Sequence, residues 1–369
     1  MDNKNYKLLD VNIMFFVLGI VLLTFGAYIQ SVNFDTGIFI TEYIIVLMPV
    51  IILGLYKKIN ISKALRLNKI KTKVVIKIFF LSLFLIPIIG FGNAVISTIL
   101  SCFNMVIVFD MPTASNSFEL LKYSFLIAIS AGICEEIFFR GMILNAYESS
   151  TNKKFAIIMS AILFGVFHFN IQNLLGPILL GIIFGYLVII TDSIYSAIIA
   201  HTLNNLVAVI GGYLTNIYFP EFYELENLNA GVNVKDMLIS TISISVVAIL
   251  SIIIILLFIK SIKKDCFKIK DNMSLIIDDE NYFNVKKKNN GLVLIRENLD
   301  FRNMSQKDIY DNMIFLSNKS LENSLIVDNY KTNKFKNING EIYKFFPLVL
   351  SITVYIYYMI AVWKSFGLM

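Results

Sequence analysis

The sequence predicts an all-α membrane protein, a polytopic bundle of about eight or nine transmembrane helices. Hydrophobic residues make up 57% of the 369-residue chain and charged residues only 16%, whereas soluble domains average about 25% charged residues. The hydrophobic residues gather in runs, and a helix needs about 20 of them to cross a bilayer. The runs cover residues 11–29, 38–56, 74–101, 124–145, 155–170, 172–190, 194–214, 238–259 and 345–363.

Most runs should form one helix each, but the third run contains residues that interrupt helices. Pro87, Gly90 and Gly92 lie within 74–101, and they should kink this helix or break it in two. The stretch before it, residues 57–73, holds seven Lys or Arg residues and no acid. Its apolar residues recur at helical spacing, which predicts a short basic helix on the cytoplasmic leaflet.

The chain is expected to have three parts: a membrane-embedded core at 1–259, a polar segment at 260–344 and a C-terminal transmembrane helix at 345–369. The polar segment holds 16 Lys or Arg and 12 Asp or Glu residues. Weak alternation from Ser274 to Leu299, interrupted by the hairpin signal Asn289-Asn290-Gly291, is consistent with a small β-rich module. A loosely ordered polar segment fits the composition equally well.

The charges of the loops predict the orientation of the bundle, because Lys and Arg concentrate in cytoplasmic loops. With 57–73 inside, the N-terminus and the segment 260–344 are cytoplasmic, and the protein is a multi-pass protein of the cell membrane. The loops at 30–37, 102–118 and 215–236 then lie outside; the first two contain no Lys or Arg, and the third is acidic. The net charge of +6 is therefore interpreted through its distribution along the loops; the predicted partner is the lipid bilayer, and no nucleic-acid partner is predicted.

Three ionisable residues lie within the fourth apolar run. At the centre of a bilayer such a residue costs roughly 2.5–3.5 kcal/mol, so each is a functional candidate. Arg140 follows Glu136 by four residues, so the two can pair on one helix face. Glu135 points about 100° away and is left to hold a water molecule and accept its proton. The alternative is a buried ion pair that only holds helices together.

The chain has two histidines, and each lies in a further apolar run. His168 could assist a general base, or it could be a core histidine bonded to a carbonyl. His201 and Asn205 are four residues apart and share a helix face, an arrangement suited to stabilising an oxyanion. Alternatively, Glu135, His168 and His201 could form a His₂Glu zinc site with one open position. The H-E-x-x-H spacing of common zinc proteases is absent.

The order of these motifs along the chain resembles a known family. Glu-Glu-x-x-x-Arg, Phe-x-x-x-His and His-x-x-x-Asn follow one another on successive apolar runs. This pattern is similar to the CPBP family of intramembrane endopeptidases (CAAX protease and bacteriocin-processing, also called Abi), which includes the type II CAAX prenyl endopeptidase. The resemblance covers roughly residues 60–260, and it does not extend to 260–369.

The resemblance implies a membrane protease and assigns a role to each motif residue. These roles are the catalytic glutamate (Glu135), its partner in activating water (His168), the oxyanion-stabilising pair (His201 and Asn205) and a supporting pair (Glu136 and Arg140).

The resemblance also implies the class of substrate. The implied substrate is a peptide or protein associated with the membrane, lipidated or anchored, processed in the manner of a CAAX protein or a leader peptide. No cofactor is required in this interpretation, and Zn²⁺ is the open alternative. Two other classes are a non-catalytic scaffold, immunity or regulatory protein of the same fold, and an ion-coupled transporter. The transporter would show inverted repeats, and the sequence shows none.

Overall fold

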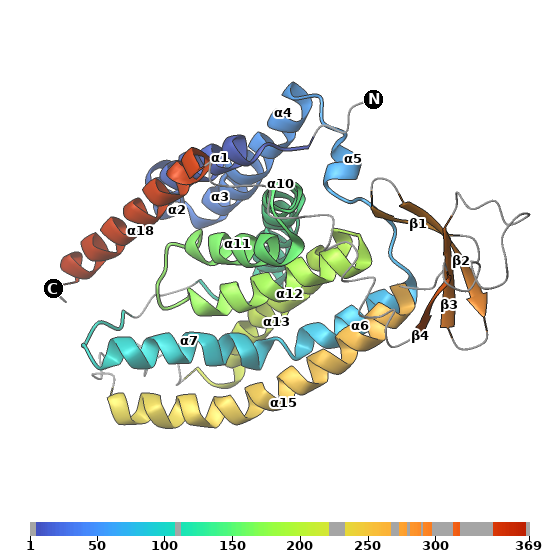
Figure 1. Cartoon of the computed structure of the whole chain (residues 1–369). Helices are drawn as coiled ribbons and strands as arrows, with labels where there is room; N and C mark the ends of the chain where they lie inside the picture. Colours follow the sequence, from blue (N-terminus) through green and yellow to red (C-terminus); the bar gives the residue numbers. More distant parts are fainter. Residues whose placement is uncertain are drawn as a thin grey trace, which may run out of the picture. The chain divides into compact units, whose positions relative to one another are not determined.

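The structure is a computed structural model, and its described residues divide into two compact units. The first unit comprises Met1–Cys266 and Asn339–Met369, and the second comprises Phe267–Ile338. The described part of the first unit is helical and that of the second consists of strands (Figure 1). The residues that the structure describes are 5–107, 112–220, 233–266, 273–278, 281–288, 291–296, 313–317 and 342–366.

The first part of the helical unit is a hairpin of two long helices. A helix that is broken in two follows, and after it comes a long helical stretch that contains polar residues. The α-helical and π-helical (η1 to η4) segments of this part are α1 (Leu8–Val21), η1 (Leu22–Gly26), α2 (Ala27–Val32), α3 (Phe34–Phe39), η2 (Ile40–Leu47), α4 (Met48–Tyr56), α5 (Ile61–Ala64), α6 (Thr72–Leu83), α7 (Ile86–Ser101), α8 (Ser117–Tyr123), η3 (Ser124–Ser130), α9 (Ala131–Glu136), η4 (Ile137–Ile143) and α10 (Leu144–Ser150). The segments from α8 to α10 follow one another without a break.

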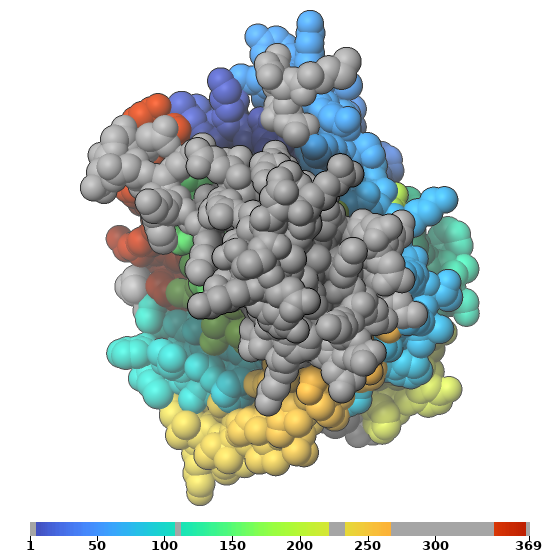
Figure 2. Space-filling model, turned by 45° about the vertical axis from the view of Figure 1, so that its right-hand side comes forward, coloured from blue at the N-terminus to red at the C-terminus, as the bar shows by residue number. Residues whose placement is uncertain are grey.

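The remaining helices of this unit come from the second half of the chain. They are α11 (Lys153–Val166), α12 (Leu175–Thr191), α13 (Tyr195–Tyr218), α15 (Val234–Cys266), the short 3₁₀ segment η6 (Ile342–Phe345) and α18 (Phe346–Ser365). Helix α15 packs along α6 and α7, α11 packs on α12, and α18 packs on α1. Figures 1 and 2 both show α15, in yellow to orange, beside the cyan α7.

The prediction of a polytopic helical membrane protein is confirmed, although fewer helices qualify as spans than the nine apolar runs. Among the described residues, six helices are long and apolar enough to cross a membrane. Helix α12 is apolar but shorter, and the helical stretch from α8 to α10 carries charged residues in its middle. The prediction of an all-α fold holds for the first unit only. The qualifying helices are Leu8–Val32, Phe34–Tyr56, Thr72–Ser101, Tyr195–Tyr218, Val234–Cys266 and Tyr343–Ser365.

Two local predictions have different outcomes. The predicted break within 74–101 is confirmed, because α6 ends at Leu83 and α7 starts at Ile86 with Pro87 in its first turn. The basic helix predicted within 57–73 is wrong in extent, since only α5, a single turn, is helical there. Asn60 caps that turn through its side chain, and Arg66 has a φ of 51°, which ends any continuation of the helix.

The second unit contains a four-stranded antiparallel sheet with the order β1-β2-β3-β4. Its strands are β1 (Met273–Asp278), β2 (Asn281–Lys288), β3 (Gly291–Arg296) and β4 (Met313–Ser317). Lys288 lies opposite Gly291 in the ladder, so the strands flank the position of the expected hairpin. Residues 289 and 290 of that expected hairpin lie outside the described residues. Strands that follow one another in the sequence are also neighbours in this sheet, which is the usual arrangement.

Polar contacts join the helix ends at two opposite sides of the helical unit. At one side, Arg66 forms an ion pair with Glu148, and Lys73 Nζ lies 2.5 Å from Asp265 Oδ1. At the other side, Lys122 Nζ lies 2.7 Å from Asp35 Oδ2. These contacts group the helix ends in the same way as the predicted inside and outside loops.

A candidate active site within the helical unit

The two carboxylates of the fourth apolar run lie on a short α-helical segment between two π-helical ones. Segment α9 ends with Glu135 and Glu136, η3 precedes it, and η4 follows it and carries Arg140. Wider turns of this kind are frequent at functional sites, because they re-aim side chains within a continuous helix. The local structure therefore sets the directions of three polar side chains within a few residues.

Glu136 is the centre of a buried polar network. Arg140 Nη1 donates to Glu136 Oε1 over 2.8 Å, and both side chains are fully buried. Nδ1 of His201 lies 2.8 Å from the same oxygen. The pairing of Glu136 with Arg140 was predicted from their spacing, but the third member of the network was not. A charged pair inside an apolar bundle needs several hydrogen bonds to offset its desolvation, and His201 supplies one of them.

Aromatic rings surround this network and exclude water from it. The ring centroid of Phe164 lies 4.4 Å from Arg140 Cζ and 5.6 Å from the ring of His201. Phe184 stacks on His201 with a centroid distance of 5.4 Å. A guanidinium over aromatic faces gains cation–π attraction, which is strongest where water is excluded. The rings thus fix the position of His201 and compensate the charge of Arg140.

Glu135 points away from the network and lines a cavity of about 210 Å³. Its side chain is 16% exposed, and its Oε2 lies 3.9 Å from Nε2 of His201. His201 is therefore held by one carboxylate through Nδ1 and faces the other through Nε2. The cavity is lined by Leu22, Leu23, Ala27, Gln30, Thr41, Glu42, Val46, Glu135, Phe167, His168, Phe169 and Tyr358.

His168 shares this cavity with Glu135, but it does not lie in a helix as predicted. Helix α11 ends at Val166, and His168 follows in a turn. Its Nδ1 lies 2.8 Å from the carbonyl oxygen of Phe164. Because that carbonyl can only accept, Nδ1 carries the proton there, and Nε2 is the basic nitrogen. The contact matches the alternative of a carbonyl-bonded histidine, and it leaves one nitrogen for chemistry.

Asn205 does not join the other predicted site residues in this structure. Its Nδ2 donates to the backbone oxygen of Ile127 over 3.2 Å, and its Oδ1 accepts from Asn204 over 3.3 Å. Neither Asn205 nor His201 lines the cavity. The expected convergence of His201 and Asn205 on one oxygen atom therefore remains a prediction.

The residues of the site do not fit a zinc centre. Within the part of the chain that the structure describes, no three His, Cys, Asp or Glu side chains are grouped so that they could hold a metal ion. The expected ligands His168 and His201 have Nδ1 bonded to a carbonyl and a carboxylate, which leaves Nε2 of each as the nitrogen that could bind a metal. A His₂Glu site would also need both histidines and Glu135 within bonding distance of one point. No step of the mechanism below passes through a metal.

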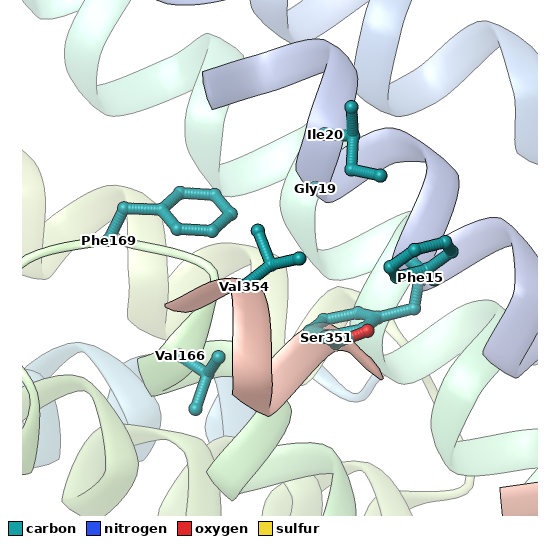
Figure 3. A pocket seen from close by; sticks show the side chains of 8 residues that line it. Phe15, Gly19, Ile20, Val166, Phe169, Ser351 and Val354 are labelled. Atoms are coloured by element: carbon teal, nitrogen blue, oxygen red, sulfur yellow. The ribbon is translucent and has the colours of Figure 1, made fainter. Parts of the chain in front are cut away.

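Helix α18 closes one side of the cavity, which the sequence did not indicate. Tyr358 lines the cavity, and its ring centroid lies 6.2 Å from that of Phe169. Asn12 on α1 donates to the backbone oxygen of Lys344 over 2.9 Å, just before α18 begins. Figure 3 shows the apolar crevice where Val354 and Ser351 of α18 face α1 and Phe169. The returning helix is thus part of the structure around the site.

Sequence reasoning also missed Glu42, the second carboxylate of the cavity. Glu42 lies in η2 and is only 7% exposed. The signal was present, since an acid within the apolar run 38–56 is a functional candidate on the same ground as Glu135. For Tyr358 no comparable signal exists, because tyrosines are common in membrane helices.

Gly132 allows the close approach of α9 and α13, and we expect Gly132→Ala to lower activity and stability. An added Cβ would lie 3.0 Å from the backbone nitrogen of Thr202 and would collide with its Oγ1. Overpacking of this kind typically costs about 1–3 kcal/mol, and here it would move His201 away from Glu135. Thermal unfolding and peptide cleavage in detergent measure both effects. The control is Gly211→Ala, where the added Cβ would meet nothing within 4 Å; equal losses in both variants would contradict the prediction.

Comparison with known proteins finds a match over the part of the chain that holds Glu135, His168 and His201. Residues 117–207 match the model of a family described as "Type II CAAX prenyl endopeptidase Rce1-like". A Bacillus subtilis (strain 168) protein named "Putative membrane peptidase YdiL" is 36% identical over 83 residues, which is 22% of this chain and 34% of that protein. The match thus spans about a third of the length of that relative. No solved structure shows a significant match to this chain.

Proposed function

Because residues 117–207 form a domain of the Rce1-like type II CAAX prenyl endopeptidase family, we propose that this chain is an intramembrane endopeptidase. It hydrolyses a peptide bond in a membrane-associated peptide or protein. The observation that carries the proposal is the position of Glu135. This carboxylate lines a cavity within the apolar helices together with His168, and a buried network holds His201 behind it.

In the proposed reaction, Glu135 is the general base. It accepts a proton from a water molecule in the cavity, and the resulting hydroxide attacks the carbonyl carbon of the scissile bond. The basic Nε2 of His168 helps to orient this water. The tetrahedral intermediate then collapses, the C–N bond breaks, and the proton held by Glu135 passes to the leaving amine. The reaction therefore needs no group beyond the side chains of the chain and water.

His201 is proposed to stabilise the negative oxygen of the intermediate, supported by Glu136 and Arg140. In this role Nδ1 stays bonded to Glu136 and Nε2, which faces Glu135, is the donor to the oxyanion. Because His201 does not line the cavity, the substrate would have to reach past Glu135 to accept this bond. Asn205, the expected second donor, would have to leave the carbonyl of Ile127 to take part.

The substrate is proposed to approach from the cytoplasmic leaflet, as a lipidated C-terminus, a leader peptide or a membrane-anchored segment. The orientation rests on the excess of Lys and Arg in the loops assigned to the inside, and two observations support the way in which the helix ends are grouped. Helix ends predicted to be inside are joined by the ion pairs of Arg66 and Lys73. Helix ends predicted to be outside are joined by the contact of Lys122 with Asp35. The segment 260–344 and the N-terminus would then face the cytoplasm.

The proposal is tested by comparing membrane and secreted peptides from cells that make the wild-type protein with those that make Glu135→Gln. A protease predicts a precursor that accumulates only in the variant cells and is cleaved by the purified wild-type protein in liposomes. A non-catalytic scaffold predicts identical peptides and an unchanged cellular phenotype. Identical peptides together with no cleavage by the purified protein would reject the proposal.

We expect the activity of the purified protein to survive exhaustive chelation. The physical reason is that, among the described residues, no three His, Cys, Asp or Glu side chains are grouped so that they could hold a metal ion, whereas a catalytic zinc needs three such ligands around one point. Cleavage rates before and after dialysis against a chelator, with the zinc content measured in parallel, check this. A reproducible loss that added Zn²⁺ restores would instead support a zinc site formed by Glu135, His168 and His201.

A further inference from the structure

Glu42 is a buried acid with no assigned role. It lies in η2 and is 7% exposed, and its Oε2 has no hydrogen-bond partner among the described residues. No ion pair of Glu42 is found in the described part of the chain. An acid without a partner within an apolar helix is unfavourable, so Glu42 is a candidate for a functional role.

The electrostatics of the cavity point to the class of group that Glu42 would meet. Two carboxylates, Glu42 and Glu135, line the cavity, and no Lys or Arg does. His168 is the only other titratable side chain of the lining apart from the tyrosine Tyr358. A cation that enters such a site gains two acidic neighbours and stabilises their ionised form, and charge-assisted hydrogen bonds are strongest in such a medium of low dielectric constant.

The wall that carries Glu42 is held in a fixed arrangement. Gln30 donates from Nε2 to Thr41 Oγ1 over 2.9 Å, and both side chains line the cavity. A Cβ on Gly37 would lie 2.5 Å from Gln30 Cα, so the helix pair is in close contact at its turn. The ring of Tyr358 also lines this cavity, and an aromatic face attracts cations.

The size of the cavity also fits a side chain. Its volume is about 210 Å³, whereas a water molecule in the liquid occupies about 30 Å³. The cavity therefore has room for a long side chain in addition to the attacking water.

We propose that Glu42 is the specificity-determining residue of a subsite for a positively charged Lys or Arg side chain of the substrate, next to the bond that Glu135 hydrolyses. This inference rests on the proposed function and names the substrate feature that the same cavity recognises. Glu42 binds the cation across the cavity from the attacking water, and it takes no part in the proton transfers.

The test uses wild-type protein in liposomes and two matched sets of acylated peptides, one with Lys and one with Met at each position flanking the cleaved bond. We expect wild type to cleave the best Lys peptide about 10- to 100-fold more efficiently, by kcat/KM, than its Met counterpart, since charge-assisted hydrogen bonds contribute in this range. Glu42→Gln should remove this preference by lowering kcat/KM for the Lys peptide to near the value for its Met counterpart. Glu42→Asp should keep a preference for Lys.

Two controls separate the possible failures. Asp35→Asn changes an acid of the same helix that does not line the cavity and pairs with Lys122, and it should keep the preference of wild type. Glu135→Gln should cleave neither peptide set. Equal cleavage of Lys and Met peptides by wild type, or equal slowing of both by Glu42→Gln, overturns the inference while the proposed function stands. Cleavage of neither set by wild type overturns both.

Discussion

Glu135→Gln should lower peptide cleavage by about 10²- to 10⁴-fold, which is the usual contribution of general-base catalysis. The amide has nearly the same shape as the carboxylate but cannot accept a proton from water. The rest of the network does not depend on the charge of Glu135, because Glu136 bonds to Arg140 and His201 through a different side chain. Expression, membrane insertion and unfolding temperature should therefore stay near those of wild type. Single-turnover cleavage in liposomes measures the effect.

The matched control for this variant is Glu119→Gln on the same helical stretch. Glu119 lies near the start of α8 and bonds to Ser115, and it does not line the cavity. Its loss should change the cleavage rate little. Substantial turnover by Glu135→Gln, within a few fold of this control, would rule out Glu135 as the base.

Arg140→Met should destabilise the protein by about 3–5 kcal/mol, the cost of breaking a buried ion pair by removing one partner. Both side chains of the pair are fully buried, so the charge of Glu136 would be left with His201 alone. The double variant Glu136→Gln/Arg140→Met should regain much of this stability, because no unpaired charge remains. It should still cleave peptides slowly, since the carboxylate that holds His201 is gone. Unfolding in mixed detergent, followed by circular dichroism, measures the stabilities.

The control for stability is Lys57→Met, which breaks the ion pair with Asp10 at 3.1 Å. That pair is partly exposed, and exposed pairs typically contribute about 0–1 kcal/mol. If Arg140→Met were no less stable than Lys57→Met, the buried network would not be a structural requirement of the site.

Hydropathy predicted the helices well where a helix is apolar throughout, and less well where the chain turns inside an apolar run. The break before Pro87 was predictable because proline ends a helix. The end of α11 at Val166 was not, since the turn that follows consists of Phe167, His168 and Phe169 and contains no Gly or Pro. Phe169 adopts a φ of 48°, and only packing against its surroundings can impose that conformation on a bulky residue.

The site was predictable to the extent that it depends on spacing within one helix. The pair Glu136–Arg140 follows from the i, i+4 relation, which fixes relative positions on a helix face. The contact of His201 with Glu136, in place of a shared oxygen with Asn205, depends on how α13 is rotated against α9. That rotation is set by tertiary packing at Gly132 and Thr202, which no pattern in a single sequence reports. Glu42 was missed for a different reason, because its apolar run was interpreted as a plain span.

The contribution of α18 to the cavity has a consequence for biosynthesis. Helices that enter the membrane early supply Glu42 and Glu135, whereas Tyr358 leaves the ribosome more than 200 residues after Glu135 (358 − 135 = 223). Until α18 inserts beside α1, the cavity lacks one wall, and Asn12 lacks its bond to the carbonyl of Lys344. The nascent chain therefore passes through a long interval in which the carboxylates are in the bilayer but the enclosure around them is incomplete. Completion of the cavity would therefore coincide with insertion of its returning helix.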